Sequence, residues 1–144
     1  APDRRAGRRL GGAHRRPRRG RRRLPRQAPP GLRRQLRRPP MIRHLVLLRF
    51  RADVARETRD GLMGDLAEAV AAIPGCGRFR SFRNVSVEGP LTQGYADGFE
   101  LLFEDAAARA AYLEDPAHQA VGARLVAETE GGAAGVLVFD SEEG

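Results

Sequence analysis

The stretch IRHLVLLRF at residues 42–50 decides the fold of this chain. Read as a strand, it sends alternate side chains to opposite faces of a sheet. One face carries Ile42, His44, Val46, Leu48 and Phe50, and the other carries Arg43, Leu45, Leu47 and Arg49. Because both faces hold aliphatic residues, we expect this strand to be covered on both sides.

A helix is expected directly after this strand. Asp53 is placed to cap its first turn, and Pro74 with Gly75 ends it after about Ile73. The apolar residues that recur at helical spacing are Leu62, Leu66, Val70 and Ile73. This pattern predicts a helix with one buried stripe.

Two further strands follow in the sequence. Residues 78–87 alternate in character and predict a second strand, and residues 88–94, which contain Pro90, read as a loop. Residues 95–103 predict a third strand, with Tyr95, Asp97, Phe99, Leu101 and Phe103 on one face. We therefore expect two consecutive strands joined by a loop.

The last part of the chain predicts two helical segments and a short strand. Glu104 and Asp105 suit a helix start, and an alanine-rich helix is expected to run to about Leu113. Asp115 and Pro116 restart a helix that reaches about Glu128, because Asp can cap and Pro is tolerated at the first helical position. Residues 131–132 end that region, and residues 136–139 give the final strand.

The resulting order, βαββαβ, predicts an α+β domain of ferredoxin-like type, with one antiparallel sheet and its helices on a single face. The other face would then expose Leu45, Leu47 and one side of the last strand. Because monomers seldom expose such a patch, we expect a homodimer that buries sheet against sheet.

Charge divides the chain into two parts. Residues 1–40 hold sixteen Arg and one Asp, about +15, whereas residues 41–144 hold ten Arg and seventeen acidic residues, about −7. The arginine- and proline-rich first part has too few apolar residues to order itself, so we expect a disordered leader. Three interpretations of it stay open: an inert or misassigned leader, a tail that binds nucleic acid or an anionic surface, and an organelle transit peptide.

The remaining composition bears on compartment and cofactors. Cys76 is the single cysteine, so an intramolecular disulfide is impossible, and a reducing, cytoplasmic location is expected. Cys76, His14, His44 and His118 lack the spacing of a metal site, so no metal or other cofactor is expected. The longest aliphatic run, residues 45–48, is far short of the roughly 20 residues of a membrane span, so no membrane association is expected.

The sequence also resembles a known family. The segments MIRHLVLLRF, RNVSVEGPLTQGYADGFELLFED and YLEDPAHQAV, in this order and spacing, are similar to the stress-responsive dimeric α/β-barrel (Dabb) family over about residues 41–140. This resemblance implies a Dabb domain at residues 41–144, with a ferredoxin-like subunit and a dimer whose two sheets form a barrel. It also implies a stress-associated or small-molecule-binding role.

Candidate site residues follow from that resemblance. Members of the family include a plant polyketide cyclase that makes olivetolic acid without a cofactor. His118 in the PAH motif, Tyr112 six residues earlier and His44 on the first strand match positions that this cyclase uses. Asp97 stands where the cyclase has a further histidine, which replaces an imidazole with a carboxylate.

Each candidate residue has a structural interpretation beside the catalytic one. His118 lies near a helix start, where the dipole favours a neutral imidazole that can act as a base, but it can equally bond to backbone there. Tyr112 can orient a substrate carbonyl or fill the helix junction, and His44 can be a satisfied core histidine. The expected cyclase-like substrate would be a polyketide-like or aromatic molecule.

Three functions therefore stay in competition. The first is a homodimeric module that binds a small apolar or aromatic ligand. The second is a cofactor-independent cyclase or lyase-like enzyme, with His118 as base and Tyr112 and His44 as positioning groups. The third is nucleic-acid binding through the leader, which requires an affinity that falls steeply with salt.

Overall fold

The computed structural model describes residues 39–143, so the expectations for the leader lie outside the described residues. Its strands are β1 (Met41–Leu48), β2 (Cys76–Arg83), β3 (Asp97–Phe103) and β4 (Val136–Glu143). Its helices are α2 (Arg56–Ala71), α3 (Ala106–Glu114) and α4 (Pro116–Ala127), with short 3-10 turns η1 (Gly89–Thr92) and η2 (Gly132–Gly135). The predicted βαββαβ order is confirmed.

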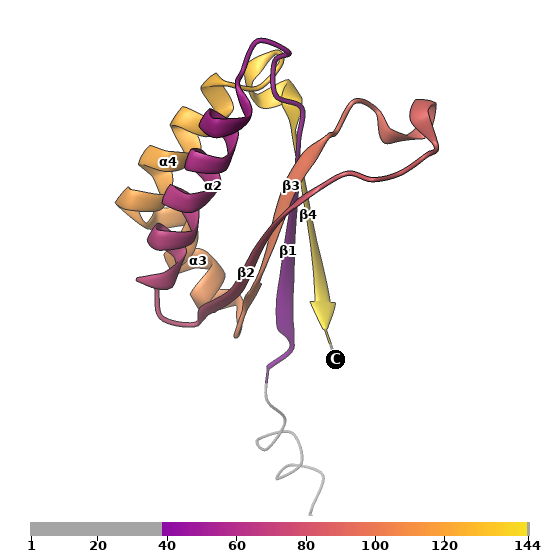
Figure 1. Cartoon of the computed structure of the whole chain (residues 1–144). Helices are drawn as coiled ribbons and strands as arrows, with labels where there is room; N and C mark the ends of the chain where they lie inside the picture. The colour runs from indigo at the N-terminus through magenta and orange to yellow at the C-terminus, as the bar shows by residue number, and fades with distance from the viewer. Residues whose placement is uncertain (1–38, 144) are drawn as a thin grey trace, which may run out of the picture. The chain divides into compact units, whose positions relative to one another are not determined.

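The four strands form one antiparallel sheet in the order β2-β3-β1-β4. The three helices all cover the same face of this sheet, and the opposite face is left bare (Figure 1). The register places His44 beside Leu101 on β3 and beside Asp140 on β4. This is the ferredoxin-like arrangement that the sequence predicts, with β1 and β3 in the centre and β2 and β4 at the edges.

One of the two predicted helix caps, Asp115, is correct, and Asp105, expected only to suit a helix start, also forms a cap. The Asp105 carboxylate accepts a hydrogen bond from the Ala108 amide, and the Asp115 carboxylate accepts one from the His118 amide, each at 2.8 Å. The prediction that Asp53 caps the first helix is wrong. A turn closed by the Val54 amide delays the helix to residue 56, with Ala55 as N-cap, and Asp53 instead accepts from Arg51.

The ends of the strands also differ from the prediction. The second and third strands are shorter than expected, because residues 84–96 leave the sheet and hydrogen-bond among themselves. β2 contains an irregularity between Gly77 and Arg80, where Arg78 takes a positive φ of 52°. The last strand is longer than expected, because it pairs with β1 along its whole length. Phe50 lies beyond β1 and forms an isolated bridge to Thr129.

The core lies between the sheet and the helices. The largest fully buried side chains there belong to Leu48, Leu66, Val70, Leu101, Phe103 and Tyr112. The bare face is different in character. We call it the open face, and its apolar side chains are those of Leu45, Leu47, Phe82, Leu137 and Phe139. Leu45 and Leu47 are half-buried, and the other three are exposed, so the expected coverage of β1 on its second face is incomplete within one chain.

Gly98 permits the close packing of the open face. A Cβ atom at this position would lie 2.5 Å from the Phe82 ring and 2.7 Å from the Val46 carbonyl oxygen. Because side chains cannot approach so closely, glycine is what allows the Phe82 ring to lie across β3. Over residues 39–143, the structure contains no helix of the length and apolarity that crossing a membrane requires.

Candidate functional site

The three residues singled out from the sequence come together beneath α3 and α4. His44 projects from β1, Tyr112 from α3 and His118 from α4. The His44 and Tyr112 rings meet edge to face with centroids 5.3 Å apart, and the Tyr112 and His118 rings stack with centroids 3.6 Å apart. We call these three side chains the ring cluster. Phe103 closes it from the sheet side, with its centroid 5.1 Å from that of Tyr112.

His44 is fixed by a carboxylate on the neighbouring strand. Its Nδ1 lies 2.6 Å from an Asp140 oxygen, and the other Asp140 oxygen accepts a hydrogen bond from Arg109 at 3.1 Å. An ionised carboxylate can only accept, so the proton of a neutral His44 belongs on Nδ1 and its Nε2 is left as an acceptor. His44 is therefore a buried histidine whose Nδ1 is satisfied by Asp140.

His118 combines a fixed backbone with an unsatisfied ring. Its amide is held by the Asp115 cap, as the spacing in the sequence predicts. Its Nδ1 is buried and has no hydrogen-bond partner within the described part of the chain. Burial has the largest effect on the pKa of the His118 imidazole and lowers it. The Tyr112 backbone carbonyl opposes this shift, and the weaker effects of His44 and Asp115 lower and raise the pKa respectively. The ring is thus biased toward the neutral form.

Tyr112 is the most deeply placed member of the ring cluster. Only 2% of it is exposed, and burial raises the pKa of its phenol far above the ordinary value, so the hydroxyl stays protonated. The negative charge of Asp140 adds to that shift in pKa. Burial also raises the pKa of the Cys76 thiol, which keeps this cysteine in the less reactive thiol form.

A surface groove lies next to Asp140, the partner of His44. The groove has a volume of about 360 Å³ and is lined by residues of β1, α3 and β4, among them Ile42, Arg109 and Asp140. None of the three rings belongs to its wall. Asp140 therefore connects the groove to His44, while the rings themselves pack against one another.

Asp97 lies in a separate place from the ring cluster. Its side chain is only 4% exposed and pairs with two arginines of α2, with Arg56 Nη1 and, at 3.0 Å, with Arg59 Nη1. Arg59 also donates to the Val54 and Arg51 carbonyl oxygens, so this ion-pair group ties the start of α2 to the start of β3. Asp97, which stands where the related cyclase has a histidine, therefore pairs with arginines of α2 and takes no part in the ring cluster.

Sequence reasoning missed two residues of the site, Asp140 and Arg109. The link between His44 and Asp140 spans 96 positions in the sequence. This contact depends on the register of β4 against β1. The predicted last strand ended at residue 139, so it did not include Asp140. An acidic residue at the end of that strand was the only available signal.

The ring cluster can bind and orient a small molecule through hydrogen bonds and through contact with its aromatic rings. It offers a neutral phenol donor on Tyr112, an unpartnered nitrogen on His118 and an oriented imidazole on His44. Within residues 39–143, no group of three or more His, Cys, Asp or Glu side chains is arranged to hold a metal ion. Acid and base chemistry is therefore what these residues can supply themselves.

Comparisons with known proteins agree with this fold. The model of the Dabb family, the stress responsive A/B barrel domain, matches residues 42–143. A dimeric ferredoxin-like protein of unknown function from Jannaschia sp. CCS1 is 36% identical, with 72% of this chain and 99% of that chain covered and a TM-score of 0.66. An Arabidopsis thaliana protein is 30% identical, with 72% and 95% covered and a TM-score of 0.64.

A more distant structure shares the fold alone. The hydroxynitrile lyase from Passiflora edulis is 14% identical, with 74% of this chain and 95% of that chain covered and a TM-score of 0.64. The comparison with curated proteins found no match. The family match spans nearly all of the described residues, and the Jannaschia protein is covered almost from end to end. The chain therefore belongs to the Dabb family of stress responsive A/B barrel domains.

Proposed function

We propose that this protein is a homodimeric Dabb module that binds a small apolar or aromatic molecule at the ring cluster, with residues 41–144 as the functional domain. The observation that carries this proposal is the convergence of His44, Tyr112 and His118 on one spot, where His44 is bonded to Asp140. A cytoplasmic location goes with it, since the chain has a single cysteine.

The chemistry of the cluster favours a ligand with an aromatic ring and one or two oxygens. Tyr112 and His118 offer flat surfaces, and the protonated phenol can donate a hydrogen bond to a carbonyl oxygen. The unpartnered Nδ1 of His118 can bind a hydroxyl or enol. Because the rings now touch one another, the ligand enters where His118, which is only half-buried, turns away from Tyr112.

Titration with benzoylacetone, an aromatic β-diketone, tests the site. We expect saturable binding to the full chain, followed by calorimetry, and about tenfold weaker binding to Tyr112→Phe, which removes only the hydroxyl. Arg124→Ala is the matched control, because Arg124 lies on the exposed side of α4 in a pair with Asp65. If wild type and Tyr112→Phe bind benzoylacetone with equal affinity, the ring cluster is not the binding site.

The homodimer is supported by the open face and by the relatives. Five apolar side chains gather on a sheet face that the chain itself leaves uncovered. Exposed apolar patches of this kind mark contact surfaces. The Jannaschia protein, at 36% identity, is described as dimeric. A two-fold pair of subunits that bury these faces against each other would cover the patch on both copies.

Sedimentation of the full chain tests the dimer. We expect twice the mass of one chain for wild type and a shift toward the monomer for Phe139→Asp, which places a charge on the open face. Leu113→Asp is the matched control, since Leu113 is also exposed but lies on α3, on the helix side. A wild-type monomer, or a Phe139→Asp dimer as stable as wild type, would contradict this part of the proposal.

A second candidate function is cofactor-independent acid–base catalysis at the same cluster. The observation that favours it is the pairing of a neutral, unpartnered His118 with a Tyr112 that stays protonated. A neutral imidazole can take a proton from carbon next to a carbonyl group while the phenol holds the developing enolate oxygen.

Hydrogen–deuterium exchange at carbon tests this candidate. In deuterated buffer we expect the full chain to accelerate exchange at the methyl group of acetophenone, a ketone whose uncatalysed exchange is slow. The acceleration would be lost in His118→Gln and would persist in Arg124→Ala. Binding without any acceleration would leave the first function and reject the second.

A further inference from the structure

The segment between β2 and β3 carries three aliphatic side chains into solvent. We call residues 84–96 the arm. Val85 is 89% exposed, Val87 is 97% exposed and Leu91 is 71% exposed. The surface of a monomeric protein seldom exposes three aliphatic side chains so close together. An exposed apolar patch of this kind marks an interaction site.

The arm is held in shape by its own hydrogen bonds. The Asn84 amide donates to the Ala96 carbonyl at 2.8 Å, and the Asn84 side chain donates to the Tyr95 carbonyl at 2.8 Å. Asn84 and Ser86 side-chain oxygens accept from the Ser86 and Glu88 amides, and a 3-10 turn follows at Gly89–Thr92. The exposed aliphatics are therefore presented on a pre-formed surface, which lowers the cost of binding.

The base of the arm is clamped to the body of the domain. The Arg49 guanidinium lies over the Tyr95 ring, 5.3 Å from its centroid, and also donates to the Ala134 carbonyl in η2 at 2.9 Å. Gly94 has a positive φ of 77°, and a Cβ atom there would lie 3.1 Å from the Arg49 side chain. Arg49 thus fixes the direction in which the arm leaves the sheet.

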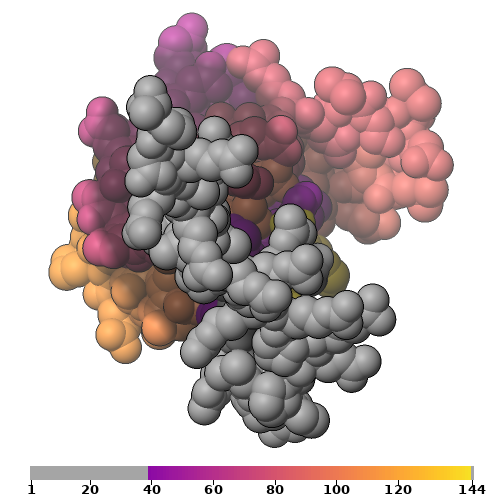
Figure 2. All heavy atoms as spheres, turned by 90° about the horizontal axis from the view of Figure 1, so that it is seen from below, coloured from indigo at the N-terminus to yellow at the C-terminus, as the bar shows by residue number. Residues whose placement is uncertain are grey.

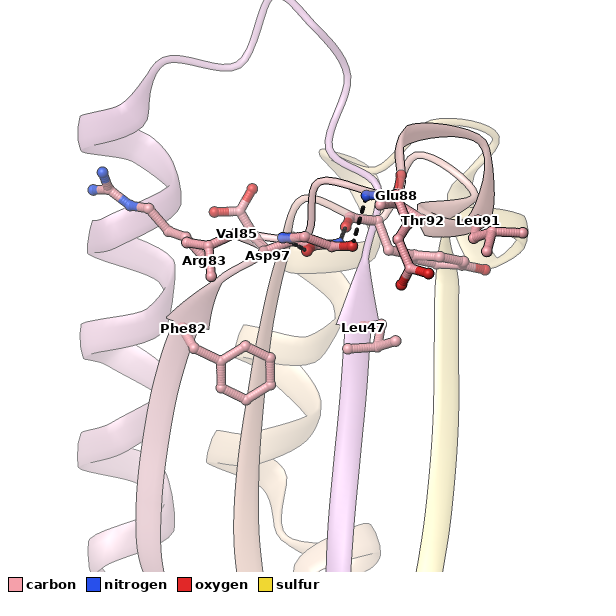
Figure 3. Close-up of a pocket in the computed structure, with 11 residues that line it drawn as sticks. Leu47, Phe82, Arg83, Val85, Glu88, Leu91, Thr92 and Asp97 are labelled. Atoms are coloured by element: carbon pink, nitrogen blue, oxygen red, sulfur yellow. Dashed lines mark hydrogen bonds between the residues drawn. The ribbon is translucent and has the colours of Figure 1, made fainter.

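That direction is away from the helices. The arm projects on the side of the open face, and it stands clear of the helices when seen from below (Figures 1 and 2). A corner pocket of about 410 Å³ lies where the arm meets the sheet, with Leu47 and Phe82 on its floor and Leu91 and Tyr95 in its walls (Figure 3). The arm and the open face therefore meet at this pocket, in which apolar side chains lie beside polar ones such as Asn84 and Glu88.

We propose that the arm is a clasp that grips a second copy of this chain, with β4 of the partner seated in the corner pocket. The inference rests on the proposed homodimer and adds to it which surfaces meet. The occupant is a second copy because the open face beside the pocket is the face whose burial defines that dimer. The arm meets that face at the pocket.

Symmetry gives the partner element. The arm grows from β2 at one edge of the sheet, and the exposed Leu137 and Phe139 lie on β4 at the other edge. When two sheets stack face to face about a two-fold axis parallel to the strands, β2 of one copy faces β4 of the other. Each arm then covers the apolar β4 side chains that the partner cannot cover itself, and the contact occurs twice.

Sedimentation of single variants of the full chain tests the clasp. We expect Val87→Asp to raise the dimer dissociation constant at least tenfold. Its side chain makes few contacts in one chain, so the fold of the subunit should persist, and circular dichroism checks this. Leu113→Asp on the helix side is the matched control and should dimerise like wild type.

Comparison with Phe139→Asp separates the clasp from the dimer itself. If Phe139→Asp and Val87→Asp both weaken the dimer, the clasp is supported. If Phe139→Asp weakens it and Val87→Asp does not, the sheet-to-sheet dimer stands and the clasp is rejected. If wild type is a monomer, both proposals fail together.

Cross-linking locates the contact. In a Cys76→Ser background, mixed Val87→Cys and Leu137→Cys proteins should form a disulfide-linked heterodimer under mild oxidation, since Leu137 is exposed on the open face of β4. Neither protein should form this product with a Leu113→Cys control. Absence of the Val87–Leu137 product from a protein that sediments as a dimer would overturn the assignment of β4 as the arm's target.

Discussion

The two faces of the sheet differ in how their side chains are buried and paired. On the helix-covered face, polar groups are buried and have partners: Asp97 pairs with two arginines, and His44 pairs with Asp140. On the open face, apolar groups such as Phe139 are left in contact with solvent. The first face is complete within one chain, whereas the second has the character of an interface that lacks its other half.

This difference assigns separate roles to the two faces. The ligand chemistry that we propose lies on the helix side, where burial shifts the pKa values of His118 and Tyr112 and where Asp140 lines a groove. Association belongs to the open side, where the apolar surface meets the arm. Substitutions that look alike should therefore have different consequences on the two sides.

The largest contrast is expected between two phenylalanines. Phe103 is fully buried beneath the helices, so Phe103→Ala should lower the free energy of unfolding by about 3–5 kcal/mol. Phe139 is 59% exposed, so within a monomeric background Phe139→Ala should lower it by less than about 1 kcal/mol. Urea denaturation at a protein concentration below the dimer dissociation constant measures both. Similar losses of unfolding free energy in the two variants would contradict the assignment of Phe103 to a buried core and of Phe139 to an exposed face.

The next contrast concerns ion pairs. Asp97→Ala leaves Arg56 and Arg59 without their buried carboxylate, and we expect a loss of about 3 kcal/mol. Asp65→Ala breaks an exposed pair with Arg124 and should cost less than about 1 kcal/mol. The same denaturation experiment compares them. If Asp97→Ala costs no more than Asp65→Ala, the Asp97 group does not anchor α2.

Much of the fold could be predicted from local sequence. Alternation located the strands, and the cap at Asp115 was correct because a cap acts on an amide only three residues away. Asp105, expected to suit a helix start, caps its helix in the same way. The Asp53 cap was wrong because a turn closed between Arg51 and Val54 shifts the helix start, and that turn leaves little trace in the sequence.

The site was predictable only in part. Resemblance to the family indicated His44, Tyr112 and His118, and the structure brings all three rings together. The partner of His44 could not be inferred, because Asp140 reaches it through the pairing of β1 with β4. Only residues 88–94 of the arm were expected as a loop, and its two ends were assigned to the flanking strands. Its order depends on contacts such as Arg49 with Tyr95, which are distant in sequence.

A smaller effect is expected from glycine substitutions on the two sides. Gly98→Ala places a methyl group against the Phe82 ring and the Val46 carbonyl, so it should destabilise the fold by about 1–3 kcal/mol. Gly122→Ala meets open space within α4 and should stabilise it by up to about 1 kcal/mol. Thermal unfolding distinguishes the opposite signs. A tolerated Gly98→Ala would show that the Phe82 ring need not lie across β3.

The smallest expected effect is a pH dependence from His118. Its pKa in the folded state lies below the ordinary value of 6.5, so the unfolded state binds a proton more readily. Stability should therefore fall as the pH is lowered through the range below 6.5, and it should level off beneath the folded pKa. His118→Gln should lose this part of the pH dependence, measured as unfolding free energy at pH 7.5 and 5.0. An unchanged pH profile would contradict the lowered pKa.

The central claim is that the open face, together with the arm, is buried against a second copy while the helix side remains in solvent. Methyl NMR of the full chain with a soluble paramagnetic agent measures this directly. At high protein concentration we predict that the methyl groups of Leu137 and Val87 are shielded, that dilution exposes them, and that Leu113 is exposed throughout. Leu137 and Val87 methyl groups as accessible as those of Leu113 at every concentration would contradict the account.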